Sequence, residues 1–139
     1  MTKIVVGIDS SDGARRALTW ALDEAVVRNA QVTTVHAWQL PVWLATPFGA
    51  VPLEADQFEA RVAEEIDRVI DEAQTAHGDV KIERLVVADS AAAALIDAAK
   101  DADLLVVGTR GRGGFAGLML GSVSQQVAQH SPCPLVIVP

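Results

Sequence analysis

Five short apolar runs alternate with segments of helical periodicity along this chain, and this alternation limits the folds open to it. The apolar runs are Ile4–Ile8, Gln31–Trp38, Lys81–Ala88, Leu104–Val107 and Leu135–Val138. The first is apolar throughout, as expected of a strand covered on both faces of its sheet. Strands separated by helices form right-handed β–α–β crossovers, which build a parallel sheet between two helix layers. The pattern predicts an α/β fold: a three-layer α/β/α sandwich around a five-stranded parallel sheet.

The segments between the apolar runs have the features of helices. Ser10–Gly13 offers capping side chains before the first of them, and Ser90 before the third. The second carries an apolar stripe with charged residues mostly on the opposite side. The predicted helical segments are Ala14–Ala25, Phe58–Ala73, Ala91–Ala99 and Val123–Gln129.

Length and charge exclude several classes of protein. A chain of 139 residues is long enough for one ordinary domain and too short for two, so residues 1–139 are expected to form a single domain. The formal charge of −7 argues against a nucleic-acid partner, which would need a basic surface. No apolar segment reaches the length that spans a bilayer, so a membrane partner is not expected.

Two further features indicate a cytoplasmic protein. The N-terminal residues lead directly into the first apolar run, so a secretory signal is not expected. Cys133 is the single cysteine, which excludes an internal disulfide and fits a reducing compartment.

A glycine-rich stretch follows the fourth apolar run and precedes the last helical pattern. It reads G-x2-G-x9-G-S, with Gly108, Gly111, Gly121 and Ser122 at the named positions. A glycine-rich turn that opens a helix exposes backbone N–H groups at the positive end of the helix dipole. That arrangement binds phosphate. The stretch therefore predicts a nucleotide held by its phosphates.

Asp9 directly follows the first apolar run. Ligands of such sheets bind at the carboxyl ends of the strands, where the strand order reverses. If the first and fourth strands are neighbours there, Asp9 and the glycine-rich loop face one crevice. Its carboxylate would then accept hydrogen bonds from ribose hydroxyls or an adenine amine. The alternative, left open by the sequence, is that Asp9 only helps to cap the first helix.

Other nucleotide motifs are absent from the sequence. There is no G-x-x-x-x-G-K-[ST], so a P-loop is excluded. The turn Gly7–Gly13 after the first strand lacks G-x-G-x-x-G, which disfavours a nicotinamide or flavin cofactor.

The complete G-x2-G-x9-G-S stretch resembles the ATP-binding signature of universal stress proteins. The resemblance extends over the whole chain and includes the opening Ile4-Val-Val-Gly-Ile-Asp-Ser-Ser, the segment Val35–Trp38 and the closing Ser131–Val138. It implies a Rossmann-like fold of the adenine nucleotide alpha hydrolase type and a bound ATP, with Mg²⁺ or Mn²⁺ carried on the ATP phosphates. It also implies that the chain is a single-domain member or one half of a tandem protein.

The resemblance also implies roles for individual residues. Asp9 would approach the adenosine, and the backbone at Gly7 and near Ala37 would frame the base. Gly108 and Gly111 would let the loop close over ribose and phosphates. The phosphate oxygens would receive N–H and hydroxyl groups of Gly121, Ser122, Val123 and Ser124.

Arg110 and Arg112 occupy variable positions of the signature. We infer from their place in the loop that they contact phosphate. The alternative is that both are solvated loop arginines.

Three functions remain compatible with these residues. The first is an ATP-binding stress-response or signalling module, in which the nucleotide stabilises one conformation or one surface for a still unknown protein partner. The second is a slow ATPase or a nucleotidyl or phosphoryl transferase, although the sequence offers no nucleophile paired with a base and no acidic cluster for metals. We therefore assign no catalytic and no metal-ligating residue. The third is a partner-binding dimer whose nucleotide site is vestigial.

Four further features carry expectations. The apolar strand Leu135–Val138 is predicted at a sheet edge, where family members commonly pair, so we expect a homodimer through it. Segment 39–53 is a lid, a partner surface or a loop folded onto its own helix layer. His36 is expected to be packed and hydrogen-bonded rather than catalytic. His77 precedes a glycine at a helix end and is expected to cap that helix.

Overall fold

The computed structural model of the chain describes residues 2–38, 53–109 and 120–139. Strands and helices alternate within these ranges, as the sequence pattern predicts. The elements are β1 (Lys3–Gly7), α1 (Asp12–Arg28), β2 (Gln31–Trp38), α2 (Leu53–Ala76), β3 (Ile82–Ala88), α3 (Ala91–Ala98), a 3₁₀ turn (Ala99–Asp101), β4 (Leu104–Gly108), α4 (Ser122–His130) and β5 (Leu135–Val138).

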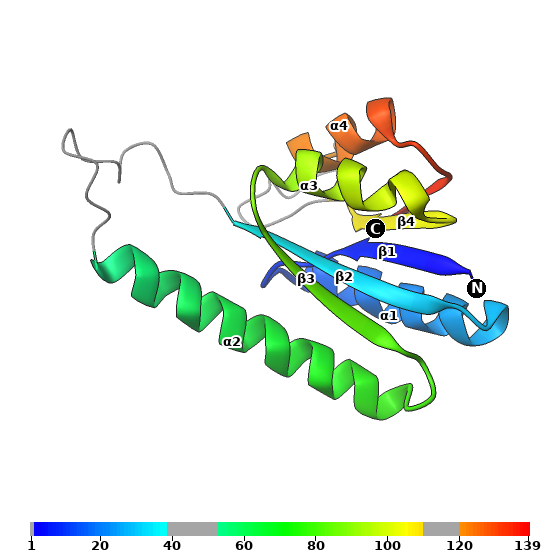
Figure 1. The fold of residues 1–139 in the computed structure, drawn as a ribbon, viewed down its shortest axis with the longest axis horizontal. Helices are drawn as coiled ribbons and strands as arrows, with labels where there is room; N and C mark the ends of the chain where they lie inside the picture. Colours follow the sequence, from blue (N-terminus) through cyan, green and yellow to red (C-terminus); the bar gives the residue numbers. More distant parts are fainter. Residues whose placement is uncertain (1, 39–52, 110–119) are drawn as a thin grey trace.

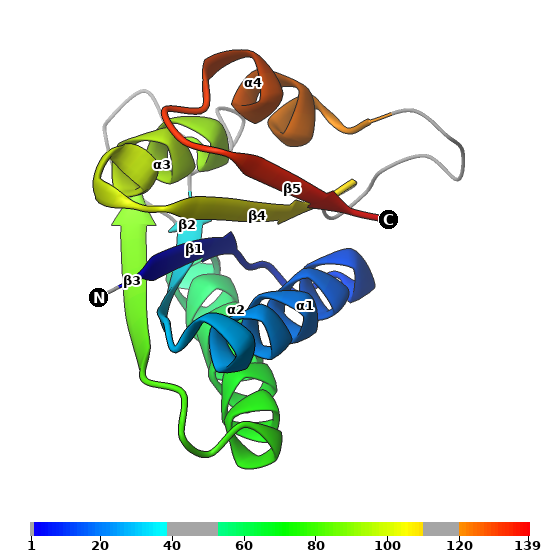
Figure 2. The same ribbon diagram turned by 90° about the vertical axis from the view of Figure 1, so that its right-hand side faces the viewer.

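The strands form one five-stranded sheet in the order β3-β2-β1-β4-β5, and each neighbouring pair is parallel. Helices α1 and α2 lie on one face of the sheet, and α3 and α4 lie on the other (Figures 1 and 2). This confirms the predicted three-layer α/β/α sandwich. The strand order reverses between β1 and β4, because the chain leaves β1 towards one edge and reaches β4 on the other side.

Two apolar clusters hold the layers together. The larger one joins α1 and α2 to the sheet through fully buried residues such as Leu18, Leu22, Ile70 and Val6. The second joins α3 and α4 to the opposite face. Successive side chains of a strand point to opposite faces, so β1 and β4 contribute to both clusters and are buried along most of their length.

The ends of the elements follow local hydrogen bonding. Ser11 caps α1, because its Oγ accepts the N–H of Ala14 at 3.1 Å. Asn29 ends the same helix in a left-handed conformation with φ 52°. Ser90 caps α3 in the predicted way. No helix of the described ranges is long and apolar enough to cross a membrane.

Candidate functional site

The two strands at the order reversal carry the predicted nucleotide residues. Ile4 of β1 lies opposite Leu104 of β4, so the strands run side by side and end at the same edge. Asp9 follows β1, and Gly108 is the last residue of β4. The adjacency on which the shared-crevice hypothesis depends is therefore confirmed.

β2 contributes to the same edge from the other side of β1. Gly7 lies opposite Val35 in the parallel register, and the N–H of Ile8 donates to the Val35 carbonyl at 2.9 Å. Ala37 is two residues further along β2. The fold thus brings the carboxyl ends of β2, β1 and β4, with Ala37, Gly7 and Gly108, to one edge of the sheet.

The N-terminus of α4 is tied directly to the end of β4. The N–H of Gly121 donates to the carbonyl of Thr109 at 2.7 Å. The hydroxyl of Ser124 lies 2.9 Å from the same carbonyl and 3.0 Å from that of Gly121. Ser124 is buried, and its hydroxyl links the residues on either side of the loop by hydrogen bonding. The sequence did not indicate this structural role. Arg110, Gly111 and Arg112 lie outside the described residues.

Helix α4 presents its first backbone N–H groups at this edge. Gly121 is its N-cap residue, and the helical bonding begins with Gln125 N–H donating to Gly121 O at 3.0 Å. The amides of Ser122, Val123 and Ser124 precede that bond, as the first N–H groups of any helix do. N–H groups in this position bind anions at the positive end of a helix dipole. The first turn of α4 contains no acidic residue that would oppose one.

Gly108 has a packing role in addition to its predicted role in the loop. A Cβ atom at this position would lie 3.0 Å from the carbonyl oxygen and 3.1 Å from the carbonyl carbon of Gly13, in the first turn of α1. Both contacts are with backbone, which cannot rotate away. Gly7 differs, because a Cβ there would meet only side-chain atoms of Leu95, the nearest at 3.0 Å.

Asp9 fixes the turn between β1 and α1. Its Oδ1 accepts the N–H of Ser11 at 2.8 Å, and Ser11 in turn caps α1. The capping role considered for Asp9 is thus partly right, although the cap itself is Ser11. A contact between Asp9 and a nucleotide stays a prediction.

His36 differs from the sequence expectation. It is packed, with 7% of the residue exposed, but neither ring nitrogen has a hydrogen-bond partner within the described ranges. Nε2 lies 3.9 Å from Oε2 of Glu59 on α2, which is too far for a hydrogen bond. The prediction of hydrogen bonding was therefore wrong, because a strand pattern reports burial and not the polar groups of the opposing helix.

Two other expectations concern possible ligands and the long segment before α2. Among the described residues, no group of three or more His, Cys, Asp or Glu side chains is placed to hold a metal ion. Segment 39–53 lies outside these residues except for Leu53, at which α2 begins, and the side chain of Phe58 is also outside them.

Comparison with known proteins places this geometry in a family. A model of the universal stress protein family matches residues 1–139. Universal stress protein Rv2623 of Mycobacterium tuberculosis is 36% identical over 138 residues, which are 97% of this chain and 46% of that protein. The chain therefore spans about half the length of the curated relatives that it matches.

Solved structures agree in fold. Universal stress protein UspA from Lactobacillus plantarum superposes with a TM-score of 0.84 at 23% identity, covering 99% of this chain and 97% of that one. A universal stress protein in complex with cAMP is 32% identical, with a TM-score of 0.71 and coverage of 99% and 95%. The family model over residues 1–139 and the 36% identity to a curated relative lead to one conclusion: the chain belongs to the universal stress protein family.

Proposed function

We propose that this chain binds an adenine nucleotide, with ATP as the principal ligand, at the carboxyl edge of β2, β1 and β4. One observation carries the proposal: the N-terminus of α4 is held beside the end of β4 by the Gly121–Thr109 and Ser124–Thr109 hydrogen bonds. These bonds fix the position of the α4 N-terminus, whose first N–H groups would bind phosphate at the positive end of the helix dipole. The relative in complex with cAMP supports an adenine ligand.

The ligand would lie across the strand order reversal. Gly7, Asp9 and Ala37 would surround the adenosine, and the amides of residues 121–124 would bind its phosphates. In the glycine-rich loop, Gly111 would let the backbone approach the ribose and phosphates, and Arg110 and Arg112 would pair with phosphate oxygens. A Mg²⁺ or Mn²⁺ ion would be carried by the phosphates of ATP.

Nucleotide binding would act as a switch in a stress-response or signalling module. A nucleotide that binds only the folded state stabilises it by mass action. It would thereby favour one conformation or one surface for a protein partner in the cytoplasm. Slow hydrolysis or group transfer is the second candidate. It differs in one measurable respect, because it converts the bound ATP.

The first test is mass spectrometry of the nucleotide released from purified, denatured protein, followed by calorimetric titration with ATP and cAMP. Retained or added ATP that remains intact over a long incubation supports the binding module. Conversion to ADP or AMP at a measurable turnover supports the enzyme. A site that stays empty after incubation with ATP and Mg²⁺ contradicts both and leaves the partner-binding dimer.

Gly121 offers a variant that separates binding from folding. Its φ of −69° and ψ of 167° suit any residue, and Asp is a favoured N-cap. Gly121→Asp should therefore keep the fold while placing a carboxylate where phosphate would bind. We expect ATP affinity to fall by about tenfold or more, equivalent to about 1.4 kcal/mol. Gly121→Asn, a neutral cap of the same shape, is the control. Equal affinities for the two variants would contradict the proposed phosphate position.

The chain is also proposed to form a homodimer through β5. Bonds from Leu105 N–H to Pro134 O and from Thr109 N–H to Val138 O show which side of β5 faces β4. Backbone groups alternate along a strand, so those of Leu135 and Ile137 point to the open edge. Antiparallel pairing of two copies there would continue the sheet.

A further inference from the structure

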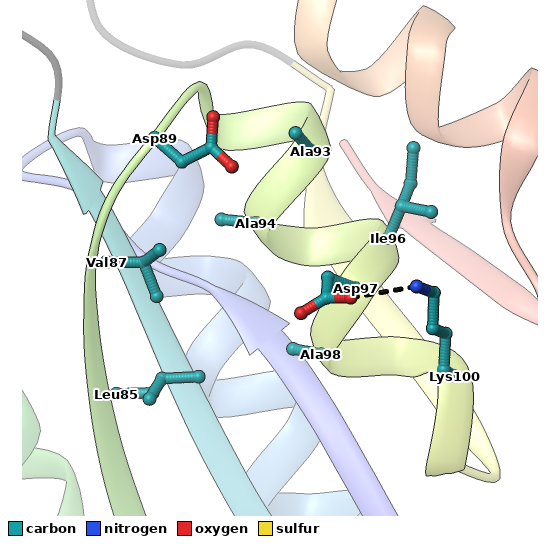
Figure 3. A pocket seen from close by; sticks show the side chains of 9 residues that line it. All are labelled: Leu85, Val87, Asp89, Ala93, Ala94, Ile96, Asp97, Ala98 and Lys100. Atoms are coloured by element: carbon teal, nitrogen blue, oxygen red, sulfur yellow. Dashed lines mark hydrogen bonds and ion pairs between the residues drawn. The ribbon is translucent and has the colours of Figure 1, made fainter.

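A groove lies between the edge strand β3 and α3. Its volume is about 380 Å³. Leu85 and Val87 of β3 form one wall, and Ala94 and Ala98 of α3 form the other (Figure 3). The groove exists because α3 packs over β2 and β1 and leaves the flank of β3 without a covering helix. We call it the β3–α3 groove.

Large apolar residues are exposed on both faces of β3. Leu85 is 38% exposed on the groove side. Its neighbour Val86 points to the opposite face and is 60% exposed. Consecutive strand residues become exposed together when the strand is an edge and both of its faces are open. A neighbouring strand would place its own side chains beside both of them, one on each face.

The backbone of β3 offers hydrogen bonds for such a strand. Val32 N–H donates to the carbonyl of Lys81 at 2.9 Å, and Thr34 Oγ1 lies 3.4 Å from the carbonyl of Glu83. Odd-numbered residues therefore direct their backbone groups at β2. By alternation, Arg84, Val86 and Ala88 direct theirs outwards. β3 is at the end of the sheet order, so among the described strands nothing pairs with these groups.

Charges around the β3–α3 groove favour a basic occupant. Its charged lining residues are Asp89, Asp97 and Lys100. The Nζ of Lys100 donates to Asp97 at 2.9 Å, which leaves the negative charge of Asp89 unbalanced by a lining cation (Figure 3). On the other face of β3, the guanidinium of Arg84 is held by Asp67 and Asp71 of α2. Its positive charge is therefore already compensated.

We propose that the open edge of β3 binds an extended segment of a partner protein, which adds as a sixth strand and places alternate apolar side chains in the β3–α3 groove and basic residues near Asp89. A second copy of this chain is the poorer occupant, because pairing two copies at β3 would bring Asp89 and Asp97 of both groove rims together. The interaction is a strand addition, in which main-chain bonds give affinity and the groove selects alternate side chains. It is independent of the proposed nucleotide site.

The test uses a blocked synthetic peptide, Lys-Thr-Val-Thr-Val-Thr-Val-Thr-Lys, in which the valines and the two terminal lysines lie on the same face of the strand. Titration into isotope-labelled protein should shift the amide resonances of residues 83–88 and 94–98. A peptide with glutamate in place of lysine should bind at least about fivefold more weakly. Shifts confined to other residues, or equal affinity for both peptides, would overturn the proposal.

Val86→Pro provides the decisive protein variant. It removes an N–H that points to the open edge and leaves the bonds to β2 intact, a placement at which strands tolerate proline. Binding should weaken at least about tenfold, whereas Val86→Thr, which keeps the N–H, should stay within about twofold. Unchanged binding by the proline variant would contradict strand addition.

N-methylated peptides test the same point with the unaltered protein, should Val86→Pro fail to fold. Methylation at the threonines blocks backbone N–H groups on one side of the peptide, and methylation at the valines blocks those on the other side. One pattern should abolish binding and the other should leave it nearly unchanged. Equal effects of the two patterns would mean that the peptide does not bind as a strand.

Discussion

The two edge strands of the sheet, β3 and β5, both carry large apolar residues but are differently covered. All four residues of β5 are half-buried, and they alternate between the two cores: Val136 and Val138 pack in one, Leu135 and Ile137 in the other. In β3, Ile82 and Val87 reach the cores, while Leu85 and Val86 are exposed. An apolar strand is therefore buried only where helices are available to cover it.

The helices explain the difference. Helix α1 contacts β5 as well as β1 and β4, and α4 lies over the opposite face near β5 (Figure 2). On one face of β3, Arg84 forms ion pairs with Asp67 and Asp71 of α2. On the other face lies the β3–α3 groove. We therefore propose different partners for the two edges, a copy of the chain at β5 and an added strand of another protein at β3.

The largest expected effect distinguishes the edges by oligomeric state. Ile137→Pro should convert the proposed dimer to monomer, because it removes an N–H from the open side of β5 and keeps the ladder to β4. Val86→Pro makes the same change on β3 and should leave the molecular mass unchanged. Light scattering coupled to size exclusion measures both. A dimeric Ile137→Pro, or a monomeric Val86→Pro, would reverse the roles given to the edges.

A matched pair of leucines should differ in stability. Leu135 packs against the second core, so Leu135→Ala should lower the free energy of unfolding by about 2 kcal/mol. Leu85 already contacts water, so Leu85→Ala should cost less than about 1 kcal/mol. Urea denaturation of monomeric Ile137→Pro protein carrying each change removes any contribution of dimerisation. Similar costs for the two leucines would show that β3 is covered in solution.

The smallest expected effect concerns the turn that leads into β3. His77 Nδ1 lies 2.9 Å from the Ala73 carbonyl, and Nε2 lies 2.7 Å from Asp23 Oδ1 on α1. This confirms that His77 caps α2. Both nitrogens face acceptors, which favours the imidazolium form. The hydrogen bond to Asp23, followed by the one to Ala73, raises the pKa of His77 above its usual value of 6.5.

Because the folded state raises this pKa, protonated His77 stabilises the protein fully below the unfolded pKa. The contribution is lost as the pH rises through the folded pKa. His77→Gln should therefore lower stability by up to about 1 kcal/mol at about pH 5 and by less at about pH 9. Chemical denaturation at the two pH values measures the change in unfolding free energy. Asp23→Asn, which removes the ionic partner of His77, is the control. A cost independent of pH would show that the contact acts without its charge.

The sequence predicted the framework well because apolar periodicity reports burial directly. The bounds of β2 and β5 agree with the predicted runs, and β1 and β4 are the neighbours that the switch-point argument required. The first and third helix caps followed from serine side chains, which compete for backbone N–H groups. Features set by residues close in sequence could thus be predicted.

Several features set by contacts between distant residues could not be predicted from the sequence pattern. The run Leu85-Val-Val87 reads as a buried strand, but the path of α3 leaves Leu85 exposed, and Val86 is exposed on the opposite face. The sequence suggests that His36 is a buried, hydrogen-bonded residue, but whether its ring nitrogens find a hydrogen-bond partner depends on the side chains of α2. At the site, topology led to Asp9 and the end of β4, whereas Gly7 and Ala37 were implied by the family resemblance; the roles of these residues, like those of Arg110, Gly111 and Arg112, stay predictions.

The contact between Gly108 and Gly13 also limits how the signature can vary. A side chain at Gly108 would press on the backbone of α1 even in a protein that never meets a nucleotide. A combinatorial library randomised at the signature and selected only for solubility should therefore still recover glycine at Gly108, whereas Gly121, whose dihedral angles suit other residues, should diversify. The glycines of one motif would then report two separate selective pressures, one for folding and one for ligand.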